Sequence, residues 1–149
     1  MAVSIVPTLL SVVSCGQQAA DRDIAVADSL SEAAPQRAMT LIDSLEGEST
    51  MNKSRHMKLL LLKAKVRNKL AMPMSTDSLK GIADYFDKHG DSNERMLAYY
   101  IIGCVYQRSQ DAPMALQYFH EAAAKADTTD SNSDFLTLHR IHAWSAEIL

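Results

Sequence analysis

Hydrophobic residues recur along most of the chain three to four positions apart, which is the spacing of one face of an α-helix. Prolines, glycines and short polar stretches separate these runs and favour turns or helix ends. No segment shows the strict alternation of apolar and polar residues that predicts a half-buried strand. The pattern predicts seven helices, at residues 23–33, 36–46, 51–70, 77–88, 91–108, 111–126 and 134–149.

Several predicted boundaries carry residues with a capping role. Asp91 and Glu94 have the spacing of a capping box, in which each side chain accepts a hydrogen bond from the other residue's backbone. Gly90, just before them, is a typical residue for ending a helix. The other signals are polar N-caps or prolines in a first turn, at Pro35, Ser75 or Thr76, Asp111 and Pro113. Because the links are short, we expect neighbouring helices to be antiparallel.

Gly103 lies inside a predicted helix, where alanine would be about 1 kcal/mol more favourable. A glycine in this position predicts the close approach of another helix, because no side chain keeps the two apart. Tyr106, Ala115, Phe119 and Ala122 follow it along the chain. Small and aromatic residues therefore alternate around one predicted helix–helix contact.

The spacing of these residues, with Tyr99 ahead of them, resembles the tetratricopeptide repeat (TPR), a helix–turn–helix unit. The resemblance implies an all-α fold in which tandem antiparallel helical hairpins stack as a right-handed TPR superhelix. About three and a half repeats would cover residues 23–149, most of them weaker matches than this one. Ile102 in place of leucine and Asp127 in place of the closing proline depart from the pattern. The residues with an implied repeat-packing role are Gly103, Tyr106, Ala115, Phe119 and Ala122.

In this family the concave surface, lined mainly by the first helix of each repeat, is the usual ligand site. We carry its positions over from Gly103, Ala64 and Ala146. The implied partner-binding groove is lined by Lys58, Leu61, Lys65, Asn68, Lys69, Leu97, Tyr100, Cys104, Gln107, Arg108 and Arg140.

Lys58, Lys65 and Lys69 share one helix face, so we expect a basic groove. We hypothesise a protein or peptide ligand with an acidic segment or chain terminus, held by charge-assisted hydrogen bonds. Asp28 and Glu32 would make one end of this groove acidic. Two alternatives remain: the lysines only solvate an exposed helix, or residues 58–70 form a cationic helix on a membrane surface.

Residues 1–20 contain no charged residue, and an apolar run extends from Ala2 to Val13. The run is too short for a membrane-spanning helix but has the length of a signal-peptide core. Val12 to Cys15 resembles the bacterial lipobox, which implies a signal peptide and flexible tether over residues 1–22 and lipid attachment at Cys15. No basic residue precedes the run, so an untethered chain or a different start is the alternative.

The layout is similar to that of bacterial TPR lipoproteins. It implies a scaffold in the cell envelope, on the periplasmic or outer-membrane face, that touches the membrane through its lipid anchor only. One alternative is the sensor half of a longer regulator. The last helix carries much apolar surface, with Phe135, Leu138, Ile141 and Trp144. We therefore expect either a chain that continues beyond Leu149 or a helix that buries this surface in a partner, such as a second copy.

Charge and motifs argue against other classes. With 15 basic and 18 acidic residues the net charge is −3, which does not favour nucleic-acid binding. No phosphate-binding loop, nucleophile elbow or CxxC motif is present, so we expect no enzyme and no cofactor. Cys104, among apolar residues, is predicted to be a packed thiol. His139, His142 and Glu147 lack a recognised metal-binding pattern, so a helical metal-dependent hydrolase is a remote alternative and we expect no metal.

Overall fold

A computed structural model describes residues 10–47 and 51–148, with side chains from residue 18 onward, and its regular structure is entirely α-helical. The prediction of an all-α fold is confirmed. The helices are α1 (Leu10–Ala33), α2 (Pro35–Glu46), α3 (Lys53–Lys69), α4 (Thr76–His89), α5 (Ser92–Arg108), α6 (Ala112–Lys125) and α7 (Phe135–Ile148).

The first helix is longer than predicted. It begins at Leu10, so residues 17–20, which we expected to form a flexible tether, are helical. Cys15 lies within this helix, but its side chain is outside the described part of the structure. Within the described residues, no helix combines the length and apolar character needed to cross a membrane.

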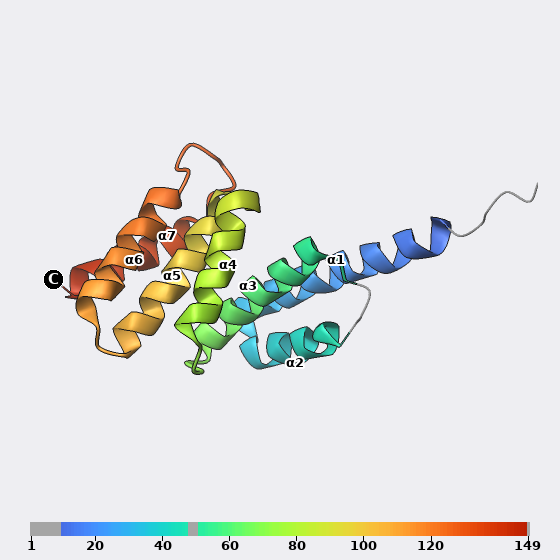
Figure 1. Ribbon diagram of the computed structural model, residues 1–149, viewed down its shortest axis with the longest axis horizontal. Coiled ribbons are helices and arrows are strands. Elements are labelled where there is room, and N and C mark those ends of the chain that lie inside the picture. The colour runs from blue at the N-terminus through green and yellow to red at the C-terminus, as the bar shows by residue number, and fades with distance from the viewer. Residues whose placement is uncertain (1–9, 48–50, 149) are drawn as a thin grey trace, which may run out of the picture.

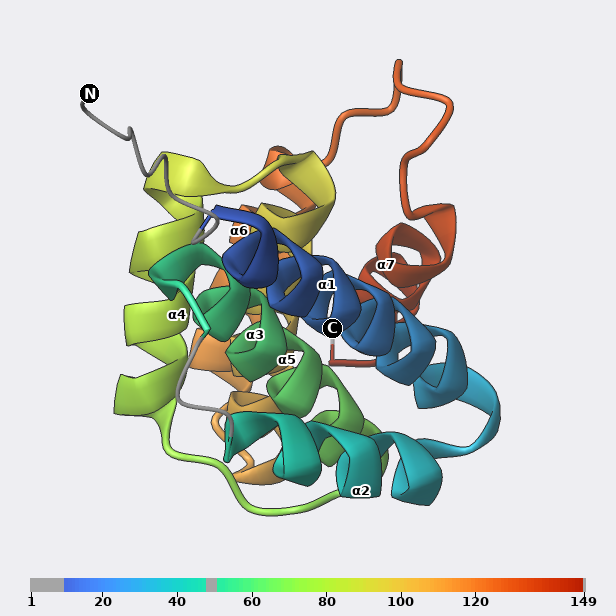
Figure 2. The same cartoon turned by 90° about the vertical axis from the view of Figure 1, so that its right-hand side faces the viewer.

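The helices form an array in which each packs against the next along the chain, from α1 at one end to α6 and α7 at the other (Figure 1). The odd-numbered helices also pack against one another, α1 with α3, α3 with α5 and α5 with α7. Among the described residues no even-numbered helix packs its backbone against another even-numbered helix, although single side chains of α4 and α6 do meet. One side of the array is therefore lined by odd-numbered helices, and Figure 2 shows α1 on this side between α3 and α7.

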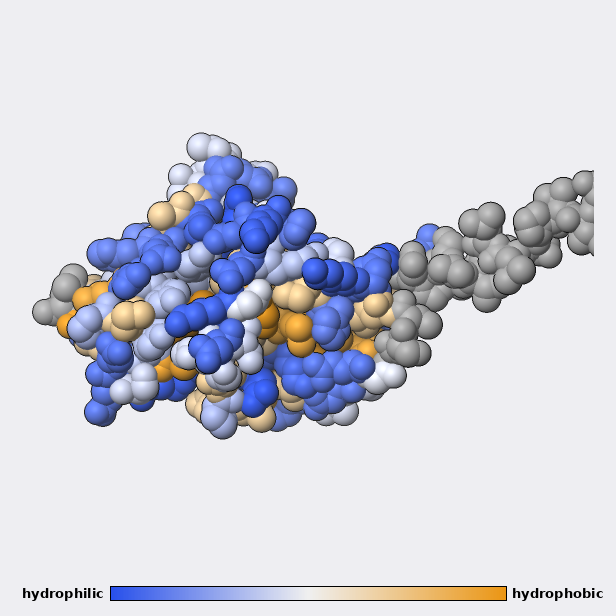
Figure 3. Space-filling view, viewed as in Figure 1, coloured by the Kyte–Doolittle hydropathy of each residue, from blue (hydrophilic) through white to orange (hydrophobic). Residues whose placement is uncertain are grey.

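Helix α3 joins two parts of the core because it buries residues on two faces. Leu59, Leu62 and Val66 pack into a cluster with α1 and α2, and Leu61 and Ala64 pack into a larger cluster with α4 to α7. The apolar residues of α3 are thus buried in the core of the protein. This arrangement contradicts the interpretation of residues 58–70 as a helix on a membrane surface. On the face shown in Figure 3, polar side chains cover most of the surface and leave only small apolar patches.

The contact between α5 and α6 explains the glycine in the middle of α5. Gly103 is buried, and a Cβ atom there would lie 2.6 Å from Cδ1 and Cε1 of Phe119. Ala115, Phe119 and Ala122 are fully buried in the same contact. Tyr106 is half-buried and stacks on Tyr118, with 5.4 Å between the ring centroids. The close neighbour of Gly103 is therefore the aromatic ring.

Most local capping signals are present in the structure. Asp91 and Glu94 form the capping box, and the Ser75 and Asp111 side chains accept hydrogen bonds from the first turns of α4 and α6. Gly90 is the C-cap of α4, as predicted, in an extended conformation with φ −93°. A Cβ atom there would lie 2.7 Å from Phe86 Cδ1, so close packing accounts for this glycine.

Ala71 ends α3 with a φ of 54°, in the left-handed region, where a Cβ atom is unfavourable. Its N–H donates to the carbonyl of Asn68, and it is exposed. We therefore expect Ala71→Gly to raise the free energy of unfolding by about 1 kcal/mol in urea titrations. Ala143→Gly, at an exposed position inside α7, is the control and should lower it by about 1 kcal/mol. Equal effects of the two changes would contradict this account.

Candidate functional site

Two adjoining hollows lie on the side of the array formed by the odd-numbered helices. The inner pocket has a volume of about 540 Å³ and is lined by Glu32, Lys65, Asn68, Lys69, Leu97, Tyr100, Ile101, Cys104, Gln107, Arg108, Thr137, Arg140 and Trp144. The adjoining hollow has a volume of about 420 Å³ and is lined by Asp21, Ile24, Ala25, Asp28, Lys58, Leu61, Leu62, Lys65, Glu94 and Leu97. The two share Lys65 and Leu97, and we call them together the groove.

The structure brings all of the groove residues expected from the sequence to this one surface. Lys58 and Leu61 line only the adjoining hollow, and the others line the inner pocket. They come together because helical spacing places them on one face of α3, α5 or α7, and these helices lie side by side. Sequence reasoning missed three residues that line the inner pocket, Ile101 on α5 and Thr137 and Trp144 on α7.

The lysines of α3 do not form the free basic strip that we expected. Helix α1 carries acidic residues at the same spacing and runs parallel to α3, so the charges meet in pairs. Lys65 Nζ lies 2.8 Å from Asp28 Oδ1 and Lys69 Nζ lies 2.5 Å from Glu32 Oε2. Lys58, farther along, lies 3.1 Å from Glu94 of α5. The groove is therefore a mixed surface in which most cations already have an acidic partner.

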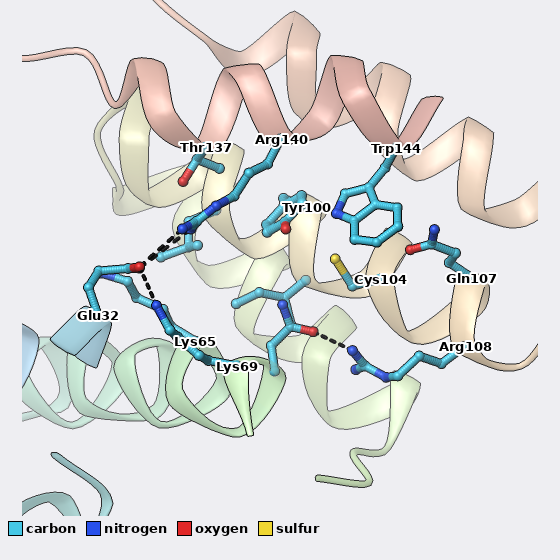
Figure 4. Close-up of a pocket in the computed structure, with 13 residues that line it drawn as sticks. Glu32, Lys65, Lys69, Tyr100, Cys104, Gln107, Arg108, Thr137, Arg140 and Trp144 are labelled. Atoms are coloured by element: carbon cyan, nitrogen blue, oxygen red, sulfur yellow. Dashed lines mark hydrogen bonds and ion pairs between the residues drawn. The ribbon is translucent and has the colours of Figure 1, made fainter. Parts of the chain in front are cut away.

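Glu32 links α1 to α7 across the inner pocket. Its carboxylate accepts hydrogen bonds from both terminal nitrogens of Arg140, at 3.4 and 3.0 Å, and from Lys69 (Figure 4). The hydrogen bonds from Arg140 and Lys69 lower the pKa of Glu32 to about 2. The carboxylate is thus ionised at neutral pH, and it holds together two helices that do not otherwise pack against each other.

The opposite end of the inner pocket has a different character. Arg108 donates a hydrogen bond to Asn68 Oδ1 at 2.7 Å, and no carboxylate within the described residues forms an ion pair with it. Tyr100 and Cys104 lie between the two ends, and Trp144 lies beside Cys104 on the side away from Glu32 (Figure 4). Tyr100 and Cys104 are buried, and Trp144 is 36% exposed. The pocket therefore combines a partly aromatic wall with one accessible guanidinium.

Cys104 is the thiol of this wall. It is buried, and burial raises its pKa above the usual value. A thiol with a raised pKa stays protonated at neutral pH, so it is a poor nucleophile. Cys104 therefore contributes packing surface to the pocket.

The histidines considered as metal ligands lie outside the groove. His139, His142 and Glu147 are all exposed on α7. Within the described residues, no three side chains of His, Cys, Asp or Glu come together in a way that could hold a metal ion.

Comparisons of this chain with protein-family models, curated proteins and solved structures found no significant match. The site itself is a groove of two hollows, with ion pairs along α1 and α3 and an accessible arginine on α5.

Proposed function

We propose that the chain is a lipid-anchored scaffold of the bacterial cell envelope, a right-handed TPR-like superhelix that holds a protein or peptide partner in its groove. The packing order supports the repeat fold, because contacts between successive odd-numbered helices are expected where hairpins stack in tandem. In this proposal Cys15 carries the lipid. Mass spectrometry of the amino terminus of the mature protein tests that part, and an unmodified Cys15 would contradict it.

The observation that carries the proposed function is the convergence of the predicted groove residues on two adjoining hollows. Ligand sites are usually concave, with an apolar lining and a few convergent polar groups. Here Asn68 and Gln107 offer amide groups that can hydrogen-bond an extended peptide backbone. Arg108 offers a cation for an acidic group of the same peptide. These groups favour a peptide with an acidic residue or terminus as the ligand.

The chain has one tryptophan, and this residue, Trp144, lines the inner pocket, so its fluorescence reports on binding there. We expect tryptophan-free acidic peptides to change this fluorescence. Gln107→Glu places a negative charge in the pocket and should weaken such binding roughly threefold to tenfold by repulsion. Gln36→Glu adds the same charge on α2, outside the groove, and is the matched control with unchanged affinity.

Two results would contradict the proposed function. One is an absence of any fluorescence change or binding with acidic peptides across a library of sequences. The other is equal weakening by Gln107→Glu and Gln36→Glu, because the effect would then come from net charge and not from the groove. Circular dichroism of both variants checks that the fold is retained.

A further inference from the structure

The cations of the inner pocket are not equally free to bind a ligand. Lys65, Lys69 and Arg140 each lie within 3.0 Å of a carboxylate of α1. Among the described residues, the side chain of Arg108 has one hydrogen-bond partner, the amide oxygen of Asn68 at 2.7 Å, and Arg108 is exposed. An incoming carboxylate therefore finds two kinds of position in this pocket: cations that are already paired with an acid of α1, and the guanidinium of Arg108, which has no ion-pair partner within the described residues.

At the first kind, the ligand must displace an acid that belongs to the protein. Glu32 is attached to the same chain as Lys69 and Arg140, so it competes at an effective concentration on the order of millimolar or above. A peptide carboxylate that binds weakly therefore does not displace Glu32 from Lys69 and Arg140. Glu32 thus fills the place that a ligand carboxylate would take between Lys69 and Arg140.

At the second kind of position, at Arg108, no carboxylate among the described residues competes with the ligand. The guanidinium of Arg108 presents several N–H groups in a plane, and a carboxylate can accept two of them in parallel. The side-chain carbonyl oxygen of Asn68 accepts a hydrogen bond from Arg108 and so fixes the guanidinium at the rim of the pocket. The amide of Gln107 lies on the same helix, one residue away.

The partly aromatic wall next to Arg108 favours a ligand that also carries an apolar side chain. In Figure 4, Tyr100 and Cys104 lie between Glu32 and Arg108, and Trp144 lies beside Cys104 on the side away from Glu32. Tyr100 is 7% exposed and Cys104 is 4% exposed, whereas Trp144 keeps 36% of its surface accessible. A large apolar side chain that covers Trp144 removes apolar surface from water and gains aromatic contacts.

We infer that the inner pocket selects a peptide segment in which one carboxylate, bound at Arg108, lies close to a large apolar side chain, bound against Tyr100 and Trp144. Glu32 excludes a second carboxylate from the position at Lys69 and Arg140. This inference rests on the proposed function and specifies its ligand. The carboxylate can come from an acidic side chain or from a chain terminus, since both present the same group.

The test uses alanine-based hexapeptides that carry one Phe and one Asp in either order, titrated against the folded chain with Trp144 fluorescence and peptide anisotropy as readouts. We expect Arg108→Gln to weaken binding about tenfold, the loss typical of a charge-assisted hydrogen bond. Arg37→Gln, the same change at an exposed position of α2 outside the groove, is the matched control and should leave the affinity unchanged. Lys65→Gln, inside the pocket, should weaken binding less than Arg108→Gln, because Lys65 is already paired with Asp28. Replacing Phe with Ala or Asp with Asn in the peptide should each weaken binding.

Peptides with free and amidated carboxyl ends distinguish the two sources of the carboxylate. Glu32→Gln provides an independent check, because it frees Lys69 and Arg140. We expect this variant, and not the wild type, to bind a peptide with two Asp residues more tightly than the peptide with one. Circular dichroism confirms that each variant is folded.

Binding that depends on Lys65 and is indifferent to Arg108 would overturn the inference while leaving the groove as the binding site. The inference is also overturned if Glu32→Gln binds the peptide with two Asp residues no more tightly than the peptide with one. Failure of every peptide to bind the wild type would instead overturn the proposed function itself.

Discussion

Replacing Gly103 with alanine is expected to lower the free energy of unfolding by about 2 kcal/mol, although alanine is the better helix former. The added Cβ atom would lie 2.6 Å from two ring atoms of Phe119. That ring is fully buried, so it cannot move aside without disturbing its neighbours in the core. The helices α5 and α6 must therefore separate, or the ring must leave its position.

Gly81 provides a matched control, because it also lies inside a helix but a Cβ atom added there would meet no other side chain or neighbouring helix within 4 Å. Gly81→Ala should raise the free energy of unfolding by up to about 1 kcal/mol. Urea denaturation of both variants measures the contrast. Phe119→Leu in the Gly103→Ala background should cost less than the sum of the single changes, since the smaller side chain relieves the clash. Equal effects of Gly103→Ala and Gly81→Ala would show that the close contact is absent.

The sequence predicted the helices well because their signals are local. Asp91 and Glu94 mark the start of α5 through residues three positions apart, and the structure has the hydrogen bonds that this spacing implies. Helix α3 begins at Lys53, two residues later than the pattern predicts, because the apolar Met51 extends the helical pattern past the Asn52 cap. Helix α1 begins at Leu10, earlier than predicted, because the uncharged segment before residue 21 resembles a signal peptide and tether and hides the start of the helix.

The groove could be predicted only in part, for a related reason. Spacing tells which residues share a face of one helix, and so it grouped Lys65 with Lys69, whereas Tyr100 and Gln107 came from the family resemblance. Spacing does not tell which faces of different helices contact each other in the fold. The contact of Glu32 with Arg140 joins residues 108 positions apart, and it depends on where α7, packed on α5 and α6, stands relative to α1. The loss of the expected basic strip follows from such pairings between helices.

Replacing Asp87 with alanine is expected to lower the free energy of unfolding by about 2 kcal/mol, because a partly buried network of three helices loses its centre. Asp87 Oδ2 accepts a hydrogen bond from the Tyr99 hydroxyl at 2.5 Å, and Oδ1 accepts one from Lys125 at 2.7 Å. Lys125 Nζ also lies 4.6 Å from the centre of the Tyr99 ring. The network joins α4 to α6, which do not otherwise pack against each other, through α5.

The matched control is Asp84→Ala, one turn earlier on the exposed surface of α4. Both changes give the helix the same gain in propensity, so their difference isolates the network. Asp84→Ala should change the free energy of unfolding by less than about 0.5 kcal/mol. A double-mutant cycle with Tyr99→Phe should show coupling of about 1 kcal/mol between Asp87 and Tyr99.

The stabilisation by Asp87 should depend on pH in a direction that its pKa fixes. Burial alone would raise the pKa of Asp87, but the hydrogen bonds from Lys125 and Tyr99 outweigh burial and leave it below the usual value. A carboxyl whose pKa is lower in the folded chain stabilises the fold fully above its unfolded pKa of about 3.9 and loses this effect as the pH falls through the folded value. The stability difference between the wild type and Asp87→Ala should therefore be constant from about pH 7 to pH 5 and shrink below about pH 4. A difference that grows on acidification would mean that Asp87 is destabilised as an anion, and the network could not then act as a clamp between α4 and α6.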